Sequence, residues 1–305
     1  MLLTLSSVTA LSPSAITAHA TALRDRGFTV VNQPIADATL LSRAAAEVVG
    51  TLDTLLEQVA DAGFHPLEQQ YLFDEICYRQ YGRWDVRRPY DTADTPAWAE
   101  LCSKVKAATV VPILAELQLG EPETLMSGAI VSRAGARAQR PHADADLEQY
   151  EAGEADETFR TFSCFIPLVD LHGSSGDGTQ FWPGSHVSAA TAEAAWERAT
   201  RDGWEQRLAR RPVGSEAPIC RAGGLVLYDS RIIHAGLPSQ GRTRPIAYLV
   251  IGTGGAQDSN FDYGRIAHGG VTPESYPFWR ELESCLGPSA GTTQQRRRKL
   301  RFRRR

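Results

Sequence analysis

The sequence predicts an α+β protein with a mainly β core, arranged as a barrel or a double-sheet jelly roll that follows a set of helices. The 305 residues are 42% hydrophobic and 22% charged, which is enough apolar material to bury a full core. After Thr124, short runs of Val, Ile, Phe and Leu alternate with Gly, Pro, Asp and Ser, a texture typical of antiparallel strands. No βαβ alternation with phosphate-loop glycines is present, which disfavours a Rossmann fold.

The N-terminal segment is expected to hold two helices with a strand between them. Ser12–Arg26 suits a short helix. The first 23 residues of the chain lack acid and are rich in Ser, Thr and Ala, which resembles a transit peptide, but the domain-like LRDRGFTVV that follows at once favours the helix. Gly27–Ile35 is typical of a glycine turn followed by a strand. Asp37–Val59 predicts a long helix. Its apolar residues recur at three- and four-residue steps and should form one buried face: Leu40, Leu41, Ala44, Val48, Leu52, Leu55 and Val59.

Residues 66–95 are mixed and aromatic, and they contain the arginines Arg79, Arg83, Arg87 and Arg88. These arginines could line a pocket for an anionic substrate. We favour the alternative of a solvated loop whose side-chain stems pack against the protein. The following segment, residues 96–119, returns to a helical pattern, with a break expected near Pro112.

The second half of the chain predicts a series of strands with one helical insert. The insert spans residues 189–211, and a linker is expected over residues 287–295. The strand-like runs are SGAIVSR (127–133), TFRTFSCFIPLVDL (158–171), GGLVLYDSRIIHAG (223–236) and RPIAYLVIGTG (244–254).

Charge is distributed unevenly along the chain. The formal net charge is −4, and eight of the last ten residues are Arg or Lys, so the rest of the chain carries −4 − 8 = −12. Residues 291–305 are therefore expected to form a disordered basic tail, with a possible weak contact to nucleic acid or an anionic surface through Arg296–Arg305. A solvated tail that only balances the acidic body is the alternative.

The expected environment is the cytoplasm, with the nucleus or an organelle as alternatives. No secretory signal is recognisable, and no apolar run approaches the roughly 20 residues that cross a bilayer. The five cysteines are scattered without CxxC spacing, which predicts reduced thiols: Cys77, Cys102, Cys164, Cys220 and Cys285.

The segment RPHADAD contains the first candidate metal ligands. His142 and Asp144 are two residues apart, so on a strand both side chains leave from the same face. His234 lies ninety residues after Asp144, at the end of a strand-like run that could come alongside. Two imidazoles and one carboxylate can fill one face of an octahedral metal ion and leave positions open for a chelating co-substrate and oxygen. An HxD pair alone is weak evidence for a metal site. Asp146, one pleat further along the strand, is an alternative ligand that we disfavour relative to Asp144.

Arg244 follows His234 by ten residues and opens the run RPIAYL. Its planar guanidinium can hold a carboxylate through two parallel hydrogen bonds, which a lysine does not reproduce. Arg242 is a rival, but the RPIAYL continuation favours Arg244. A further histidine, His186 in the turn PGSH, is expected to bond to backbone as a structural turn residue rather than to bind metal.

Together, the HxD pair, the PGSH turn, GGLVLYDSRIIHAG and the downstream arginine resemble the phytanoyl-CoA dioxygenase family of Fe(II)/2-oxoglutarate oxygenases. The resemblance covers Gln139 to about Gly252 and the opening LRDRGFTVV, whereas residues 50–125 match only loosely. It implies a double-stranded β-helix (jelly roll) with the N-terminal helices packed on one sheet. It also implies one oxygenase domain over residues 1–290, with helical support to about 125, a core over about 126–255 and a C-terminal extension.

The resemblance implies that His142, Asp144 and His234 bind Fe(II), and that Arg244 anchors the distal carboxylate of the co-substrate 2-oxoglutarate. The iron ligands would be the only catalytic residues. The implied reaction consumes O2, hydroxylates an unactivated C–H bond of a small-molecule substrate and releases succinate and CO2.

Three further positions match the co-substrate pocket of the family: Gln139, Phe165 and Thr179. One departure is Asp177, because many members have Asn before the glycine of this turn segment. Two other functions are kept as alternatives. The chain could be a non-catalytic jelly-roll binding module, or it could work on nucleic acid or a partner protein through its basic tail.

Overall fold

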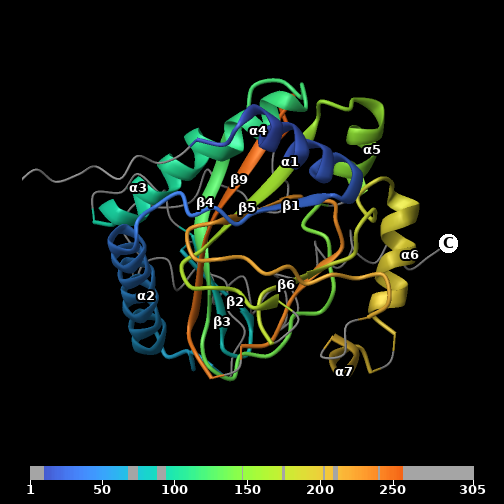
Figure 1. Ribbon diagram of the computed structural model, residues 1–305. Coiled ribbons are helices and arrows are strands. Elements are labelled where there is room, and N and C mark those ends of the chain that lie inside the picture. Colours follow the sequence, from blue (N-terminus) through green and yellow to red (C-terminus); the bar gives the residue numbers. More distant parts are fainter. Residues whose placement is uncertain are drawn as a thin grey trace, which may run out of the picture.

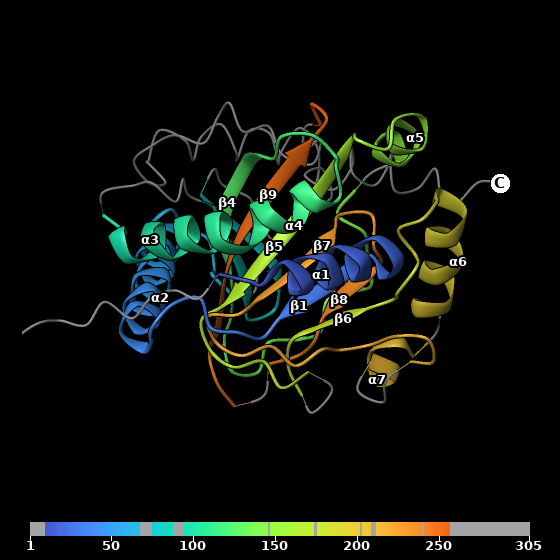
Figure 2. The same ribbon diagram turned by 45° about the horizontal axis from the view of Figure 1, so that its top comes forward.

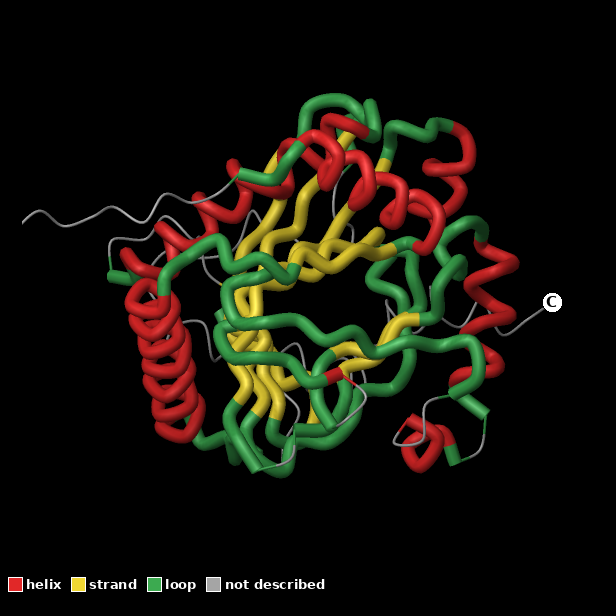
Figure 3. Tube along the Cα trace, viewed as in Figure 1, coloured by secondary structure: helices red, strands yellow, loops and turns green. Residues whose placement is uncertain are grey.

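The computed structural model describes residues 10–67, 75–87, 94–145, 147–173, 176–201, 203–208, 212–239 and 241–256. A seven-stranded antiparallel sheet forms its centre, with a two-stranded sheet beside it and helices outside (Figures 1 and 3). The large sheet has the order β1–β7–β5–β9–β4–β3–β2. Its strands are β1 (Phe28–Val31), β2 (Ile76–Gln80), β3 (Arg83–Arg87), β4 (Glu123–Ser132), β5 (Arg160–Pro167), β7 (Leu225–Asp229) and β9 (Arg244–Thr253). The small sheet pairs β6 (Thr179–Phe181) with β8 (His234–Gly236). The predicted α+β fold with a jelly-roll core is confirmed.

Side chains along the large sheet alternate between two environments, as the pleat of a strand requires. On β5, Phe162 and Cys164 belong to the main hydrophobic core, whereas Ser163 and Phe165 line a pocket. The same alternation continues on β7 and β9, with Leu225, Leu227, Ala247, Leu249 and Ile251 in the core and Tyr228, Ile246, Tyr248 and Val250 at the pocket. One face of the sheet is therefore apolar, and the other face builds a site.

Helices α1 (Pro13–Arg26) and α2 (Ala38–Asp61) help to cover the apolar face of the sheet (Figure 2). The N-cap of α1 is Ser12, whose hydroxyl accepts a hydrogen bond from the Ala15 backbone N–H, and the helix ends at Gly27 in a left-handed conformation. Asp37 caps α2 by accepting from the Leu40 backbone N–H. The buried residues of α2 are the seven that the periodicity predicted, so that face is confirmed.

The predicted helix over residues 96–119 is interrupted. It consists of α3 (Pro96–Val105), a π-helical turn over Lys106–Val110 and α4 (Val111–Glu116). The wider turn lies just before Pro112, which has no backbone N–H and whose ring crowds the preceding turn. The expected break near this proline is confirmed.

Residues 66–95 contain a hairpin of β2 and β3, so the expected solvated loop is wrong for the described part of this segment. Arg83 and Arg87 are buried, with exposed fractions of 1% and 7%. The reason is that Trp84 and Val86 join the core on one side of β3, which turns Arg83 and Arg87 toward the interior of the jelly roll. The first 125 residues thus supply three strands as well as helices. Arg88 lies outside the described residues.

Three shorter helices lie beyond β4. α6 (Ala189–Ala199) and α7 (Trp204–Leu208) confirm the helical insert, and Ser188 caps α6 by accepting from the Thr191 backbone N–H. α5 (Leu147–Ala155) was not predicted.

Within the described ranges, no helix is long and apolar enough to cross a membrane. The four cysteines of these ranges are buried and free. Asp146, Cys285, the predicted linker and the basic tail fall outside the ranges that the structure describes.

Candidate metal centre

His142 and His234 are held next to each other in a pocket through their own backbones. The His142 N–H donates to the His234 carbonyl at 2.9 Å, and the His234 N–H donates back to His142 at 2.8 Å. This bridge holds the two imidazole rings side by side, with 4.4 Å between their centroids. Residues 92 positions apart in the sequence are therefore fixed in register next to each other.

Asp144 completes the cluster, although not from a regular strand as the sequence predicted. Among the described residues of RPHADAD, only His142 makes a β-bridge. Pro141 has no N–H, and the backbone N–H groups of Asp144 and Ala145 donate to the Ser230 carbonyl instead of to a ladder. The Asp144 carboxylate oxygens lie 3.8 Å from Nε2 of His142 and 3.7 Å from Nε2 of His234.

The hydrogen bonds around the cluster orient each donor atom. Nδ1 of His142 lies 2.8 Å from the Arg140 carbonyl and Nδ1 of His234 lies 3.1 Å from the Ile232 carbonyl. A carbonyl only accepts, so both Nδ1 atoms carry the proton and both Nε2 lone pairs face Asp144. The Tyr228 hydroxyl donates to Oδ2 of Asp144 at 3.1 Å.

This donor set fits a divalent transition metal. One ligand atom from each of the three residues lies within 4.8 Å of the others, and neutral imidazole nitrogens with a carboxylate oxygen are the ligands of a facial triad. His142, Asp144 and His234 would hold such an ion, and because all three line the pocket, a co-substrate in the pocket could reach it. No other cluster of this kind was found in the described ranges of the chain.

Arg244 lies inside the same pocket at the start of β9, and its exposed fraction is 2%. Nη2 donates to the Leu237 carbonyl at 3.1 Å, whereas Nε and Nη1 are buried without a hydrogen-bond partner. Burial lowers the pKa of Arg244 to about 10, against the opposing effect of Asp177. Two unpaired N–H donors on a buried cation fit a carboxylate such as that of 2-oxoglutarate.

The other arginine considered from the sequence, Arg242, is engaged elsewhere. It forms an ion pair with Asp177 at 2.7 Å, and about a third of its side chain is exposed. The remaining predicted pocket residues, Gln139, Phe165 and Thr179, line the pocket together with the three cluster residues and Arg244. The structure thus brings all seven predicted site residues to one cavity.

The pocket also contains charged residues from the segment for which the sequence analysis favoured a solvated loop over a pocket lining. Arg79, Arg83 and Asp85 line it. Asp85 is buried, yet its pKa is lowered, because Arg79, Arg87 and a hydrogen bond from Tyr248 outweigh the effect of burial. The signal in the sequence is the alternation in RWDVR, where Trp84 and Val86 mark one apolar face and the charged residues share the other.

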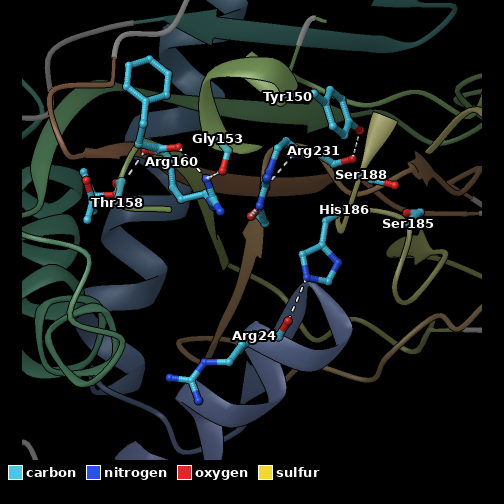
Figure 4. Close-up of polar contacts among 12 residues, drawn as sticks. Arg24, Tyr150, Gly153, Thr158, Arg160, Ser185, His186, Ser188 and Arg231 are labelled. Carbon is cyan, nitrogen blue, oxygen red and sulfur yellow. Dashed lines mark hydrogen bonds and ion pairs between the residues drawn. The ribbon is translucent and has the colours of Figure 1, made fainter. Parts of the chain in front are cut away.

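A second polar layer supports the turn that carries His234. Arg231 forms a bidentate ion pair with Asp229 at 2.9 and 2.6 Å, and the Tyr150 hydroxyl donates to the Arg231 carbonyl (Figure 4). Next to this pair, Nε2 of His186 donates to the Arg24 carbonyl at 2.9 Å. His186 is therefore the structural residue that the sequence predicted. The layer fixes residues 229–233, which connect β7 to the metal-site strand β8.

The family model of phytanoyl-CoA dioxygenase (PhyH) matches residues 23–245 of this chain. The chain belongs to this family. Phytanoyl-CoA dioxygenase family members are non-haem iron enzymes that depend on 2-oxoglutarate, so the chain is a 2-oxoglutarate-dependent dioxygenase whose cofactor is iron. No curated protein matches the chain by sequence.

Solved structures with a similar fold match most of this chain. The α-ketoglutarate-dependent epimerase SnoN from nogalamycin biosynthesis is 16% identical, with 86% of this chain and 93% of that chain covered and a TM-score of 0.57. The carbocyclase SnoK from the same biosynthesis is 16% identical, with 88% and 96% covered and a TM-score of 0.54. EctD from S. alaskensis, solved with 2-oxoglutarate and 5-hydroxyectoine, is 18% identical, with 82% and 81% covered and a TM-score of 0.51.

Proposed function

We propose that this chain hydroxylates an unactivated C–H bond of a small-molecule substrate and releases succinate and CO2. In this proposal His142, Asp144 and His234 hold Fe(II), and Arg244 binds the distal carboxylate of 2-oxoglutarate. The observation that carries it is the cluster of two imidazoles and one carboxylate in the same pocket as a buried guanidinium with two unpaired N–H groups. When bound, the iron with 2-oxoglutarate and O2 supplies the oxidising power for the reaction.

The side chains around the centre prepare it for that chemistry. The carbonyls of Arg140 and Ile232 hold the imidazoles in the tautomer that a metal needs, and the Tyr228 hydroxyl holds the Asp144 carboxylate. Gln139 and Thr179 offer polar atoms to the co-substrate. Phe165 and Ile246 form an apolar part of the wall of the same pocket, which helps to exclude water from it.

The neighbours of known structure support a small-molecule substrate. SnoN and SnoK belong to nogalamycin biosynthesis, and EctD was solved with 5-hydroxyectoine. SnoN is described as an epimerase and SnoK as a carbocyclase, so one fold serves different reactions. The proposal is therefore limited to a small molecule with a C–H bond that can reach the metal.

The decisive experiment measures binding and turnover separately. Under anaerobic conditions, Fe(II) and 2-oxoglutarate should bind to the wild-type protein, as shown by calorimetry and by the visible charge-transfer band of the chelate. With O2 and a metabolite mixture, succinate should form in a substrate-dependent manner. His142→Ala should lose both, whereas the matched control His65→Ala, at an exposed position, should keep both. A wild-type protein that binds neither Fe(II) nor 2-oxoglutarate would instead be a non-catalytic jelly-roll module.

We also propose a single oxygenase domain over residues 1–290 and a cytoplasmic location, the latter supported by the free thiols of the four described cysteines. The basic residues among Arg296–Arg305 are proposed to make an accessory contact with nucleic acid or an anionic surface. Deleting residues 296–305 should abolish salt-sensitive binding to duplex DNA while succinate formation continues. Unchanged DNA binding in the deletion variant would refute the accessory contact.

A further inference from the structure

Arg83 lies deep in the pocket, beside Arg244. It sits on the inward face of β3, its exposed fraction is 1%, and it lines the same cavity as the metal cluster. Nη1 donates to Oε1 of Gln139 at 2.7 Å and Nη2 donates to the Leu237 carbonyl at 2.5 Å. Because Arg244 donates to that same carbonyl, the two guanidinium groups are neighbours.

The absence of a side chain at Gly236 makes room for this guanidinium. A Cβ added at Gly236 would overlap Nη1 of Arg83 and would also crowd Oε1 of Gln139. Gly236 lies two residues after His234 on β8, so the space that its missing side chain leaves is on the same side of the strand as the His234 imidazole. Arg83 thus brings a cation from a distant strand to a position next to a metal-site residue.

The charges of these two arginines are not balanced by the protein. Neither Arg83 nor Arg244 forms an ion pair within the described ranges. Asp177 is the carboxylate that raises the pKa of Arg244, but it is ion-paired with Arg242. Nε of Arg83 is buried without a partner, as are Nε and Nη1 of Arg244. Burial and the charge of Arg244 both lower the pKa of Arg83 well below its usual range. Two adjacent buried cations with unused donors favour an anion between them.

We propose that Arg83 is a second binding residue for the distal carboxylate of 2-oxoglutarate, admitted to the pocket by Gly236 and acting together with Arg244. This inference rests on the proposed function, because it assumes that 2-oxoglutarate occupies the pocket. In it, Nε of Arg83 donates to the carboxylate that Arg244 also binds, while Nη1 and Nη2 keep their bonds to Gln139 and Leu237. The role is one of binding and positioning, since Arg83 does not touch the reacting atoms.

Two ligands separate this role from a purely structural one. 2-Oxoglutarate and 2-oxopentanoate share the 2-oxo acid group and the five-carbon chain, but 2-oxopentanoate lacks the distal carboxylate. Calorimetry on the Mn(II)-loaded protein gives a Kd for each. Arg83→Gln should raise the Kd of 2-oxoglutarate by about 10- to 100-fold, the loss of a charge-assisted hydrogen bond, and leave that of 2-oxopentanoate unchanged. The matched control Arg242→Gln should change neither.

Equal weakening of both ligands by Arg83→Gln, or no weakening of either, overturns the proposal. If Arg83→Gln does not fold, the double variant Arg83→Met, Gly236→Ala fills the vacated space with a methyl group and should show the same selective loss. A wild-type protein that does not bind 2-oxoglutarate with Mn(II) would refute the proposed function itself. If the wild type and the Arg83→Gln variant bind 2-oxoglutarate equally well, only the role of Arg83 is refuted.

Discussion

Arg242 is ion-paired to Asp177, with 2.7 Å between Nη2 of the arginine and Oδ2 of the carboxylate. Burial alone would raise the pKa of Asp177, but the hydrogen bonds from Arg242 and from the His172 backbone N–H lower it. Asp177 therefore binds the half-buried Arg242 and leaves the guanidinium of Arg244 without an ion pair among the described residues.

The first prediction compares these two arginines. Arg244→Gln should raise the Kd of 2-oxoglutarate by about 10- to 100-fold, because each charge-assisted hydrogen bond contributes about 1.5–3 kcal/mol. Arg242→Gln should leave the Kd unchanged, because its guanidinium is satisfied by Asp177. Calorimetry on the Mn(II)-loaded protein measures both. A larger effect at 242 than at 244 would reverse the assignment.

The second prediction concerns the buried pair of Asp229 and Arg231. Arg231→Met should lower the free energy of unfolding by about 3–5 kcal/mol, because it leaves the Asp229 carboxylate buried without its partner. Urea denaturation of the metal-free protein measures this loss. The double variant Asp229→Asn, Arg231→Met removes both charges and should recover much of it. A single variant as stable as the wild type would show that the pair does not stabilise the turn before His234.

The third prediction tests how tightly Arg83 fills the space beside Gly236. Gly236→Ala should destabilise the protein by about 1–3 kcal/mol, because the added methyl group overlaps the guanidinium. In an Arg83→Ala background the same substitution should cost little. Denaturation midpoints of the four proteins give a double-mutant cycle with a clear coupling energy. Additive effects would mean that the two positions do not compete for space.

The fourth prediction is a pH dependence that comes from His186. Burial lowers the pKa of His186 below the ordinary 6.5, against the opposing effect of Asp229. The imidazole therefore binds a proton less readily in the folded state than in the unfolded chain. The stability of the fold should therefore be complete above about pH 6.5 and decline as the pH falls below that value. Denaturation midpoints between about pH 7.5 and 5.5 should fall more steeply for the wild type than for His186→Gln. Parallel curves would exclude His186 as the cause.

Several parts of this fold could be predicted because one local rule determined each of them. The buried face of α2 follows from helical periodicity, and the seven residues predicted are the seven buried. The spacing of His142 and Asp144 predicted a shared direction, which the structure keeps even though the regular strand reduces to a single bridge at His142. The run from Gly223 to Gly236, expected as one strand, is β7, a turn and β8 in two different sheets. The polar Asp229–Arg231 pair marks that turn.

What the sequence did not predict depends on contacts between distant segments. Charged residues that alternate with apolar ones usually face solvent, and in β3 they face a closed interior because the jelly roll folds over Arg83. Nothing local to Arg83 indicates that a glycine 153 positions later makes room for it. α5 has no clear apolar stripe, and the bond of its Tyr150 to the Arg231 carbonyl joins it to the supporting layer of the site.

The backbone bridge between His142 and His234 links the stability of the fold to metal binding. The two histidines close a loop of more than ninety residues, and only two main-chain hydrogen bonds join them directly. An ion bound by both rings would act as a clip across the opening and would add its binding energy to that of the native state. Without that ion, the contact between the segments that carry His142 and His234 would be weaker, so removal of the metal should lower the stability of the pocket as well as its activity.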